Sequence, residues 1–207
     1  MNIDSIIFDL DGTLWDSTEV ILKAWNKVIS DKGELRDPIT IKELQGTMGL
    51  LIKDIGARLL PNLDEGTQEK VMELCCKVEK ELLLKEGGVL YPKLEDTLRE
   101  LSQKYSLFIV SNCQCGYIET FLEYHNMEKY FKDIECAGST GLVKGENIKK
   151  VIERNNLKNP VYVGDTQGDF DGARLAKIPF VYASYGFGKV TEYDYIIEEI
   201  SDLLKVF

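Results

Sequence analysis

The chain has 207 residues, of which 44% are hydrophobic and 29% are charged, and its formal net charge is −10 at pH 7. This is the size and composition of a globular core with a modest insertion, and the negative charge disfavours nucleic acid and anionic membrane surfaces as partners. No apolar run approaches the roughly 20 residues of a membrane span and no basic segment of a signal peptide opens the chain, so we expect a cytoplasmic protein.

A short apolar strand at residues 6–8 leads directly into Asp9 and Asp11. Side chains alternate along an extended segment, so acids at i and i+2 project to the same side. Gly12 then permits a sharp turn. Carboxylates gathered at the carboxyl edge of an α/β sheet would repel each other without a cation, which indicates a hard metal ion, most simply Mg²⁺. A turn or capping role for the two acids is the alternative.

Residues 18–86 have a helical pattern. Apolar residues recur at helical spacing over 20–29 and again over 71–82, and glycines and a proline interrupt the stretch between them. Gly87 and Gly88 end this block, which is almost purely α-helical.

After residue 90, predicted helices and short apolar strands alternate. The predicted helices cover residues 94–105, 116–124, 146–155 and 169–176, and the predicted strands cover 107–110, 134–137, 161–163 and 180–182. Repeated β-α-β units with uninterrupted apolar strands indicate a parallel sheet that is covered on both faces. The predicted fold is therefore α/β, a doubly wound, Rossmann-like parallel sheet with an all-helical cap inserted after its first strand.

Three further polar segments lie near the ends of predicted strands. Ser111 and Asn112 follow the strand at 107–110 and lead towards a helix N-terminus, an arrangement that suits a phosphate, although Ser111 could instead cap that helix. Lys144 stands just before the helix at 146–155. Asp165 and Asp169 follow the strand at 161–163.

The order and content of these four segments resemble the haloacid dehalogenase-like hydrolase superfamily, whose members are mostly Mg²⁺-dependent phosphatases. The segment 9–13 alone is a strong signal, and all four occur in order. The helical insertion resembles the C1-type cap of the phosphoglycolate phosphatase and β-phosphoglucomutase branch. The resemblance spans essentially the whole chain and implies a core domain, 1–15 and 88–207, and a cap domain, 16–87. One departure is Gly145-Glu146 after Lys144, where the family often has Pro-x-Pro.

The resemblance implies a Mg²⁺-dependent phosphatase that hydrolyses a small phosphomonoester, a phosphoglycolate- or sugar-phosphate-like metabolite, through an aspartyl phosphate. Asp9 would be the nucleophile and Asp11 the acid and base. Lys144 would balance the phosphoryl charge, and Ser111 and Asn112 would bind the phosphate.

The resemblance also implies the metal ligands, which would be the carboxylates of Asp9 and Asp165, the backbone carbonyl of Asp11, and Asp169 directly or through water. Thr47 falls where such caps carry a substrate-facing loop and is a candidate for substrate contact. The segment 186–188 resembles a loop near the active site of phosphoglycolate phosphatase-like proteins, and a plain turn explains it equally well.

Two other functions remain open at this point. A β-phosphoglucomutase-like phosphomutase would use the same core and differ in its cap. A non-catalytic regulatory protein that binds a phosphorylated ligand could keep the fold. In each case the expected partner is a small phosphorylated metabolite, with neither nucleic acid nor membrane, and the expected state is a monomer or homodimer.

Overall fold

The computed structural model describes residues 3–33 and 35–207. Its centre is a six-stranded sheet in the order β5-β4-β1-β6-β7-β8, in which all neighbouring strands pair in parallel. The strands are β1 (Ser5–Phe8), β4 (Ser106–Ser111), β5 (Phe131–Cys136), β6 (Pro160–Gly164), β7 (Phe180–Ala183) and β8 (Tyr195–Ile197). The predicted doubly wound α/β core is confirmed.

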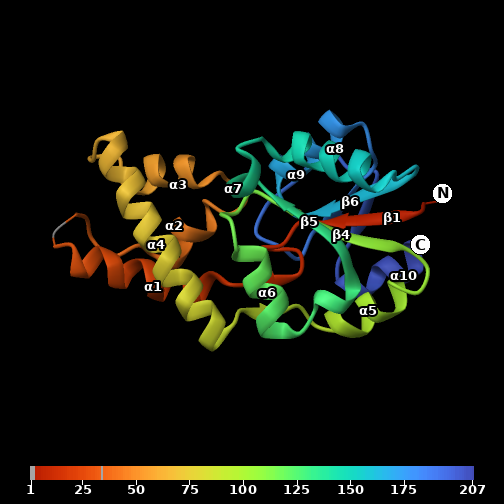
Figure 1. Ribbon diagram of the computed structural model, residues 1–207, viewed down its shortest axis with the longest axis horizontal. Helices are drawn as coiled ribbons and strands as arrows, with labels where there is room; N and C mark the ends of the chain where they lie inside the picture. Colours follow the sequence, from red (N-terminus) through yellow and green to blue (C-terminus); the bar gives the residue numbers. More distant parts are fainter. Residues whose placement is uncertain (1–2, 34) are drawn as a thin grey trace.

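Helices cover both faces of the sheet (Figure 1). They are α8 (Lys144–Asn155) and α9 (Gln167–Ala176) on one face, and α5 (Leu94–Leu101), α6 (Tyr117–His125) and α10 (Leu203–Val206) on the other. Side chains of the central strand β1 alternate between the two cores, because Ile7 packs with the residues of α8 and α9 while Ile6 and Phe8 pack with those of α5 and α6. β1 is therefore buried on both sides, as its apolar sequence requires.

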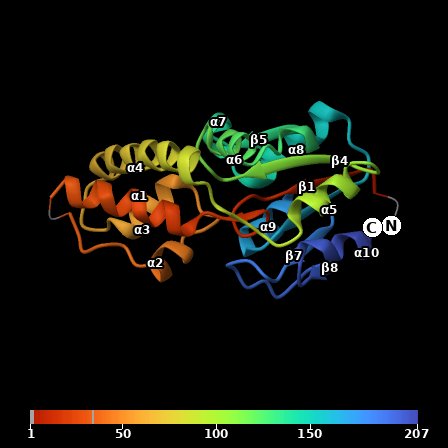
Figure 2. The ribbon, with the colours of Figure 1, turned by 90° about the horizontal axis from the view of Figure 1, so that it is seen from below.

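The helices between β1 and the rest of the sheet lie to one side of it, away from the chain ends, as Figure 2 shows. They are α1 (Thr18–Asp31), α2 (Ile41–Gln45), α3 (Ile52–Leu59) and α4 (Glu65–Glu86). We call residues 18–86 the helical group. Asp64 caps the start of α4 by accepting a hydrogen bond from the Thr67 N–H, and Gly87, with φ of 68°, ends it. No helix among the described residues is long and apolar enough to cross a membrane.

The chain crosses between sheet and helical group twice, at β2 (Trp15–Asp16) and at β3 (Val89–Leu90), and these two short strands pair antiparallel. The sequence analysis did not predict this ribbon. It also missed β8, α10 and α7 (Ala137–Thr140), as well as the 3₁₀ turns η1 (Glu128–Tyr130) and η2 (Ile200–Asp202). The predicted strand at 134–137 is β5, which begins three residues earlier, at Phe131, and ends at Cys136. The prediction missed its start because exposed Lys132 and half-buried Asp133 interrupt the apolar pattern of this edge strand.

Candidate active site

Asp9 follows β1 directly and is buried, with 1% of its surface exposed. Its N–H donates to the Val163 carbonyl at 2.8 Å, which fixes it beside the end of β6. Its Oδ1 lies 2.9 Å from Nζ of Lys144. Burial and the neighbouring Asp169 raise the pKa of Asp9 to about 7, although Lys144 acts in the opposite direction. Lys144 therefore does not outweigh the combined effect of burial and the neighbouring carboxylate on the pKa of Asp9.

Lys144 is the first residue of α8, and only 3% of its surface is exposed. Its Nζ lies between two carboxylates, because it is also 2.5 Å from Oδ1 of Asp169. Burial alone would lower the pKa of Lys144, but Asp169 and Asp9 outweigh burial and raise it above the ordinary value for lysine. The side chain is therefore a fixed buried cation.

Asp169 combines a structural and an electrostatic role. Its Oδ2 accepts hydrogen bonds from the N–H of Asp165 at 3.2 Å and from the N–H and hydroxyl of Thr166 at 2.9 and 2.7 Å, which caps the start of α9. Its Oδ1 accepts from Lys144. Both oxygens are therefore occupied, and Asp169 holds Lys144 in place.

Asp165 follows β6 and is fully buried. Its Oδ2 accepts hydrogen bonds from the N–H groups of Phe187 and Gly188 at 2.7 and 3.3 Å, so the segment 186–188 supports this carboxylate. Gly12, with φ of 81°, allows the close approach, because a Cβ there would lie 2.3 Å from Asp165 Oδ2. The turn after β1 and the loop after β7 thus meet at one acid.

Asp9, Asp165 and Asp169 together form a buried acidic cluster. Each offers one carboxylate oxygen, and these atoms lie within 4.8 Å of one another. Oδ1 of Asp9 is buried without a hydrogen-bond partner of good geometry in the described part of the chain, although it pairs with Lys144. Carboxylate oxygens are hard ligands, and three buried carboxylates beside one lysine fit a divalent cation such as Mg²⁺. The cluster could therefore hold a metal ion.

One carboxylate oxygen of Asp11 accepts hydrogen bonds from three different side chains. Its Oδ1 accepts from Nε1 of Trp15 at 2.9 Å, from the Ser17 hydroxyl at 2.6 Å and from the Tyr117 hydroxyl at 2.8 Å. Burial raises the pKa of Asp11, and these three donors act against it, with a net pKa above the ordinary value. The sequence analysis missed this network. Trp15 and Ser17 are near in sequence but reach Asp11 only because the chain turns back at β2, and Tyr117 comes from a distant helix.

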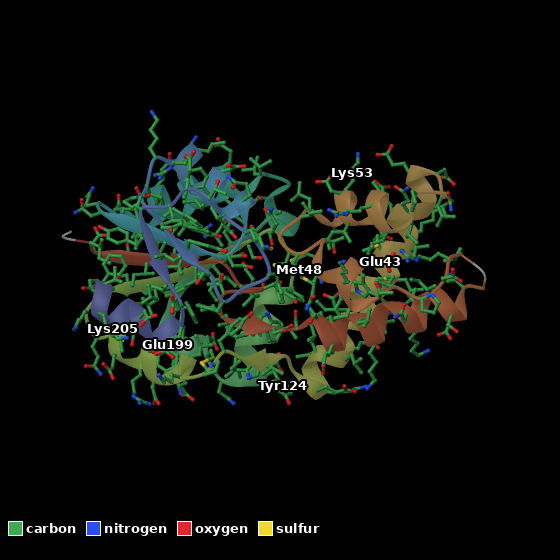
Figure 3. The ribbon with its side chains drawn as sticks, turned by 180° about the vertical axis from the view of Figure 1, so that it is seen from behind. Glu43, Met48, Lys53, Tyr124, Glu199 and Lys205 are labelled. Carbon is green, nitrogen blue, oxygen red and sulfur yellow. The ribbon has the colours of Figure 1, made fainter. Side chains whose placement is uncertain are left out.

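A cavity of about 40 Å³ lies between the sheet edge and the helical group. Among the residues that line it are Asp9, Asp11, Ser111, Asn112 and Tyr117 from the sheet side, and Ile21, Trp25, Met48, Gly49 and Glu79 from the helical group. Met48, labelled in Figure 3, lies where the helical group faces the sheet. The cavity has room for about three water molecules, which is less than a phosphate ester occupies.

Two hydrogen bonds join the helical group to the sheet side at this cavity. Nδ2 of Asn112 donates to the Gly49 carbonyl at 2.8 Å, and Nε2 of Gln114 donates to Oε1 of Glu79 at 2.6 Å. Beyond the cavity, a groove of about 870 Å³ continues between α3, α4 and α7, with Asn112 and Gln114 on its wall. The cavity therefore opens to the surface along the boundary between the two parts.

The structure brings most of the predicted site residues to one place. Those gathered around Asp9 or lining its cavity are Asp9, Asp11, Ser111, Asn112, Lys144, Asp165 and Asp169. Thr47 is different, because its hydroxyl donates to the Leu44 carbonyl at 2.7 Å and it is not among the described residues that line the cavity. Its neighbours Met48 and Gly49 take that position.

The family model for haloacid dehalogenase-like hydrolases matches residues 6–183. The chain belongs to this family. Its sequence is 26% identical to that of a phosphoglycolate phosphatase of Aliivibrio fischeri, over 90% of this chain and 86% of that protein. It is 27% identical to a phosphoglycolate phosphatase of Aquifex aeolicus, over 97% and 95% of the two chains. A solved structure of a haloacid dehalogenase-like hydrolase from Streptococcus pneumoniae superposes with a TM-score of 0.87 at 24% identity, over 99% and 98% of the chains. The prediction of a phosphatase-type hydrolase of this family is confirmed.

Proposed function

We propose that this chain is a Mg²⁺-dependent phosphatase that hydrolyses a small phosphomonoester through a covalent aspartyl phosphate on Asp9. The observation that carries the proposal is the buried arrangement of Asp9, which pairs with Lys144, belongs to an acidic cluster and shares a cavity with Asp11. The names of the relatives, phosphoglycolate phosphatases, support a small substrate.

Two carboxyl groups divide the chemistry. A carboxylate oxygen of Asp9 attacks phosphorus, the ester P–O bond breaks, and protonated Asp11 gives its proton to the leaving oxygen. Ionised Asp11 then takes a proton from a water molecule as that water attacks the same phosphorus. The bond between phosphorus and Asp9 breaks, and inorganic phosphate leaves. The raised pKa of Asp11 suits a group that must first hold a proton.

The remaining residues hold the phosphoryl group. Ser111 lies in the cavity wall next to Asp9, where its hydroxyl can donate to a phosphate oxygen, and Lys144 keeps Asp9 oriented while it balances negative charge. The metal ligands in this proposal are Asp9, Asp165, the backbone carbonyl of Asp11, and Asp169 through water, because both Asp169 oxygens already accept hydrogen bonds. When bound, Mg²⁺ supplies positive charge beside the phosphoryl oxygens.

The helical group has the position of a cap. We assign residues 16–87 to a cap domain and residues 1–15 and 88–207 to the core, with the β2–β3 ribbon at the crossing. Opening would admit substrate, and closing would exclude bulk water from the phosphoryl transfer. A small cavity favours a small metabolite over a macromolecule.

The test is a panel of phosphomonoesters that includes phosphoglycolate, sugar phosphates and an aryl phosphate, each with Mg²⁺ or with EDTA. We expect phosphate release that requires the metal and falls by at least roughly a thousandfold in Asp9→Asn, because the nucleophile is lost. The matched control is Asp171→Asn, since Asp171 is exposed and its Oδ1 accepts from Gln167. Isomerised sugar phosphate in place of released phosphate would contradict the proposal and favour a phosphomutase.

A further inference from the structure

We infer that Glu79 is a specificity-determining residue, and that this site selects phosphate esters of small alcohols that present hydroxyl groups and excludes those that carry a carboxylate next to the ester. The inference rests on the proposed phosphatase function and names the substrate class within it.

Glu79 is buried inside the helical group, with 1% of its surface exposed. It lies on α4 and lines the same cavity as Asp9 and Asp11. Its Oε2 accepts from Nε1 of Trp25 at 2.5 Å, and its Oε1 accepts from Nε2 of Gln114 at 2.6 Å. Of the described residues that the helical group contributes to the cavity wall, Glu79 is the charged one, and the others are apolar side chains and a glycine.

No lysine, arginine or histidine is among the described residues that line this cavity. Lys144 does not line the cavity and already pairs with two carboxylates, those of Asp9 and Asp169. Lys53, Lys77 and Lys80 line the outer groove instead, and Lys53 lies at the outer edge of the helical group in Figure 3, where it pairs with Glu65. The described residues therefore place no cation at the end of the cavity next to Asp9, where a substrate carboxylate would lie.

Asn112 gives independent evidence for the same preference. Its Nδ2 donates to the Gly49 carbonyl, which makes Oδ1 the free acceptor of this amide. Oδ1 is buried and has no hydrogen-bond partner in the described part of the chain. A buried acceptor without a partner costs free energy until a donor reaches it. A substrate hydroxyl would supply that donor, and a carboxylate would not.

A substrate carboxylate at this point would face the carboxyl group of Glu79 across a small and largely apolar cavity. Burial already raises the pKa of Glu79 to about 8. Above pH 8, where Glu79 is ionised, two carboxylates in such a place cannot both stay ionised without a large penalty, so one of them must take up a proton when substrate binds. A substrate hydroxyl has no such cost and can donate a hydrogen bond to Oδ1 of Asn112 or to the carboxyl group of Glu79. The inferred preference therefore differs from that of its relatives, whose names give phosphoglycolate as their substrate.

The test compares two substrates that differ at a single carbon. 2-Hydroxyethyl phosphate and phosphoglycolate share the same phosphate ester and differ in a terminal CH₂OH against a carboxylate. We expect the wild-type kcat/KM with Mg²⁺ to favour 2-hydroxyethyl phosphate by at least roughly tenfold. In Glu79→Gln, which keeps the shape and removes the ionisable group, we expect this ratio to fall by roughly tenfold when both enzymes are assayed above pH 8, where the Glu79 carboxyl group is charged. Glu81→Gln is the control, because Glu81 is exposed on the same helix, and it should leave the ratio unchanged.

Each outcome separates the inference from the function on which it rests. A wild-type enzyme that cleaves phosphoglycolate as well as or better than 2-hydroxyethyl phosphate overturns the substrate class while the phosphatase proposal stands. A ratio unchanged in Glu79→Gln overturns the role of Glu79. If that variant does not fold, Glu79→Met provides the same comparison with an apolar side chain of similar length. No phosphate release from any ester, aryl phosphate included, is a failure of the proposed function itself.

Discussion

Replacing Gly12 by alanine tests how closely the turn after β1 must approach Asp165. The backbone of Gly12 has φ of 81°, and an added Cβ would lie 2.3, 2.5 and 2.7 Å from Oδ2, Cγ and Oδ1 of Asp165. All three distances are below van der Waals contact. The Asp165 side chain cannot simply turn away, because Phe187 and Gly188 hold its Oδ2 through their N–H groups.

Two costs add in this variant. A residue with a Cβ costs about 1–2 kcal/mol in the left-handed region, and overpacking a buried site costs about 1–3 kcal/mol. We therefore expect Gly12→Ala to lower the free energy of unfolding by about 2–5 kcal/mol. Displacement of Asp165 should also weaken the metal site, so Mg²⁺ should stabilise the variant less than it stabilises the wild type.

Urea unfolding with and without Mg²⁺ measures both effects, and Gly141→Ala separates the two costs. Gly141 has φ of 71° but no atom within 4 Å of its added Cβ, so this variant has the backbone cost alone. The expected difference between the two variants is about 1–3 kcal/mol. Equal destabilisation, or an unchanged response to Mg²⁺ in Gly12→Ala, would refute the steric reasoning.

Two further predictions concern the charges around the nucleophile. Lys144→Met leaves Asp9 and Asp169 as buried carboxylates without their cation, so we expect the free energy of unfolding to fall by about 3–5 kcal/mol and saturating Mg²⁺ to restore part of this loss. The control is Lys149→Met on the same helix, whose partly exposed ion pair with Glu146 should contribute less than about 1 kcal/mol. A loss no larger than that of the control would contradict the buried ion pair. Tyr117→Phe removes a hydrogen-bond donor that lowers the pKa of Asp11, so this pKa should rise by about one unit. The value of kcat/KM falls at alkaline pH when Asp11 loses its proton, and this fall should move to higher pH by the same amount. A pH profile that does not move would exclude Asp11 as the group that sets this limb.

The parts of the fold that the sequence predicts well are those in which neighbouring residues carry the whole signal. The central strands β1, β4, β6 and β7 are buried on both faces and therefore appear as uninterrupted apolar runs. The edge strands are different. β5 has exposed Lys132 and half-buried Asp133, which pairs with Arg154, so its pattern resembles a polar loop as much as a strand.

The same distinction applies to the candidate site. Asp9 and Asp11 lie two residues apart directly after β1, and both line the cavity as the sequence predicts, although β1 ends at Phe8 and the chain already bends at Leu10. Glu79 lies in a helix rich in lysine and glutamate, where one more charged residue indicates a solvated face. It is buried because α4 packs against α1 and α6, where Trp25 and Gln114 bind its carboxyl group, and no local pattern contains these contacts between distant segments. Tyr117 reaches Asp11 in the same way.

The charge balance of the site explains why a metal ion is expected there. Asp9, Asp11, Asp165 and Asp169 bring four carboxyl groups around one cation, Lys144, within a chain whose net charge is already −10. A phosphate ester carries negative charge of its own, and electrostatic repulsion is strong where water is excluded. Protonation of one or two acids would relieve the repulsion but would also remove the nucleophile. A divalent cation is the remaining way to gather these acids, keep Asp9 ionised and admit a phosphate, so chelation by EDTA should abolish turnover while the fold persists.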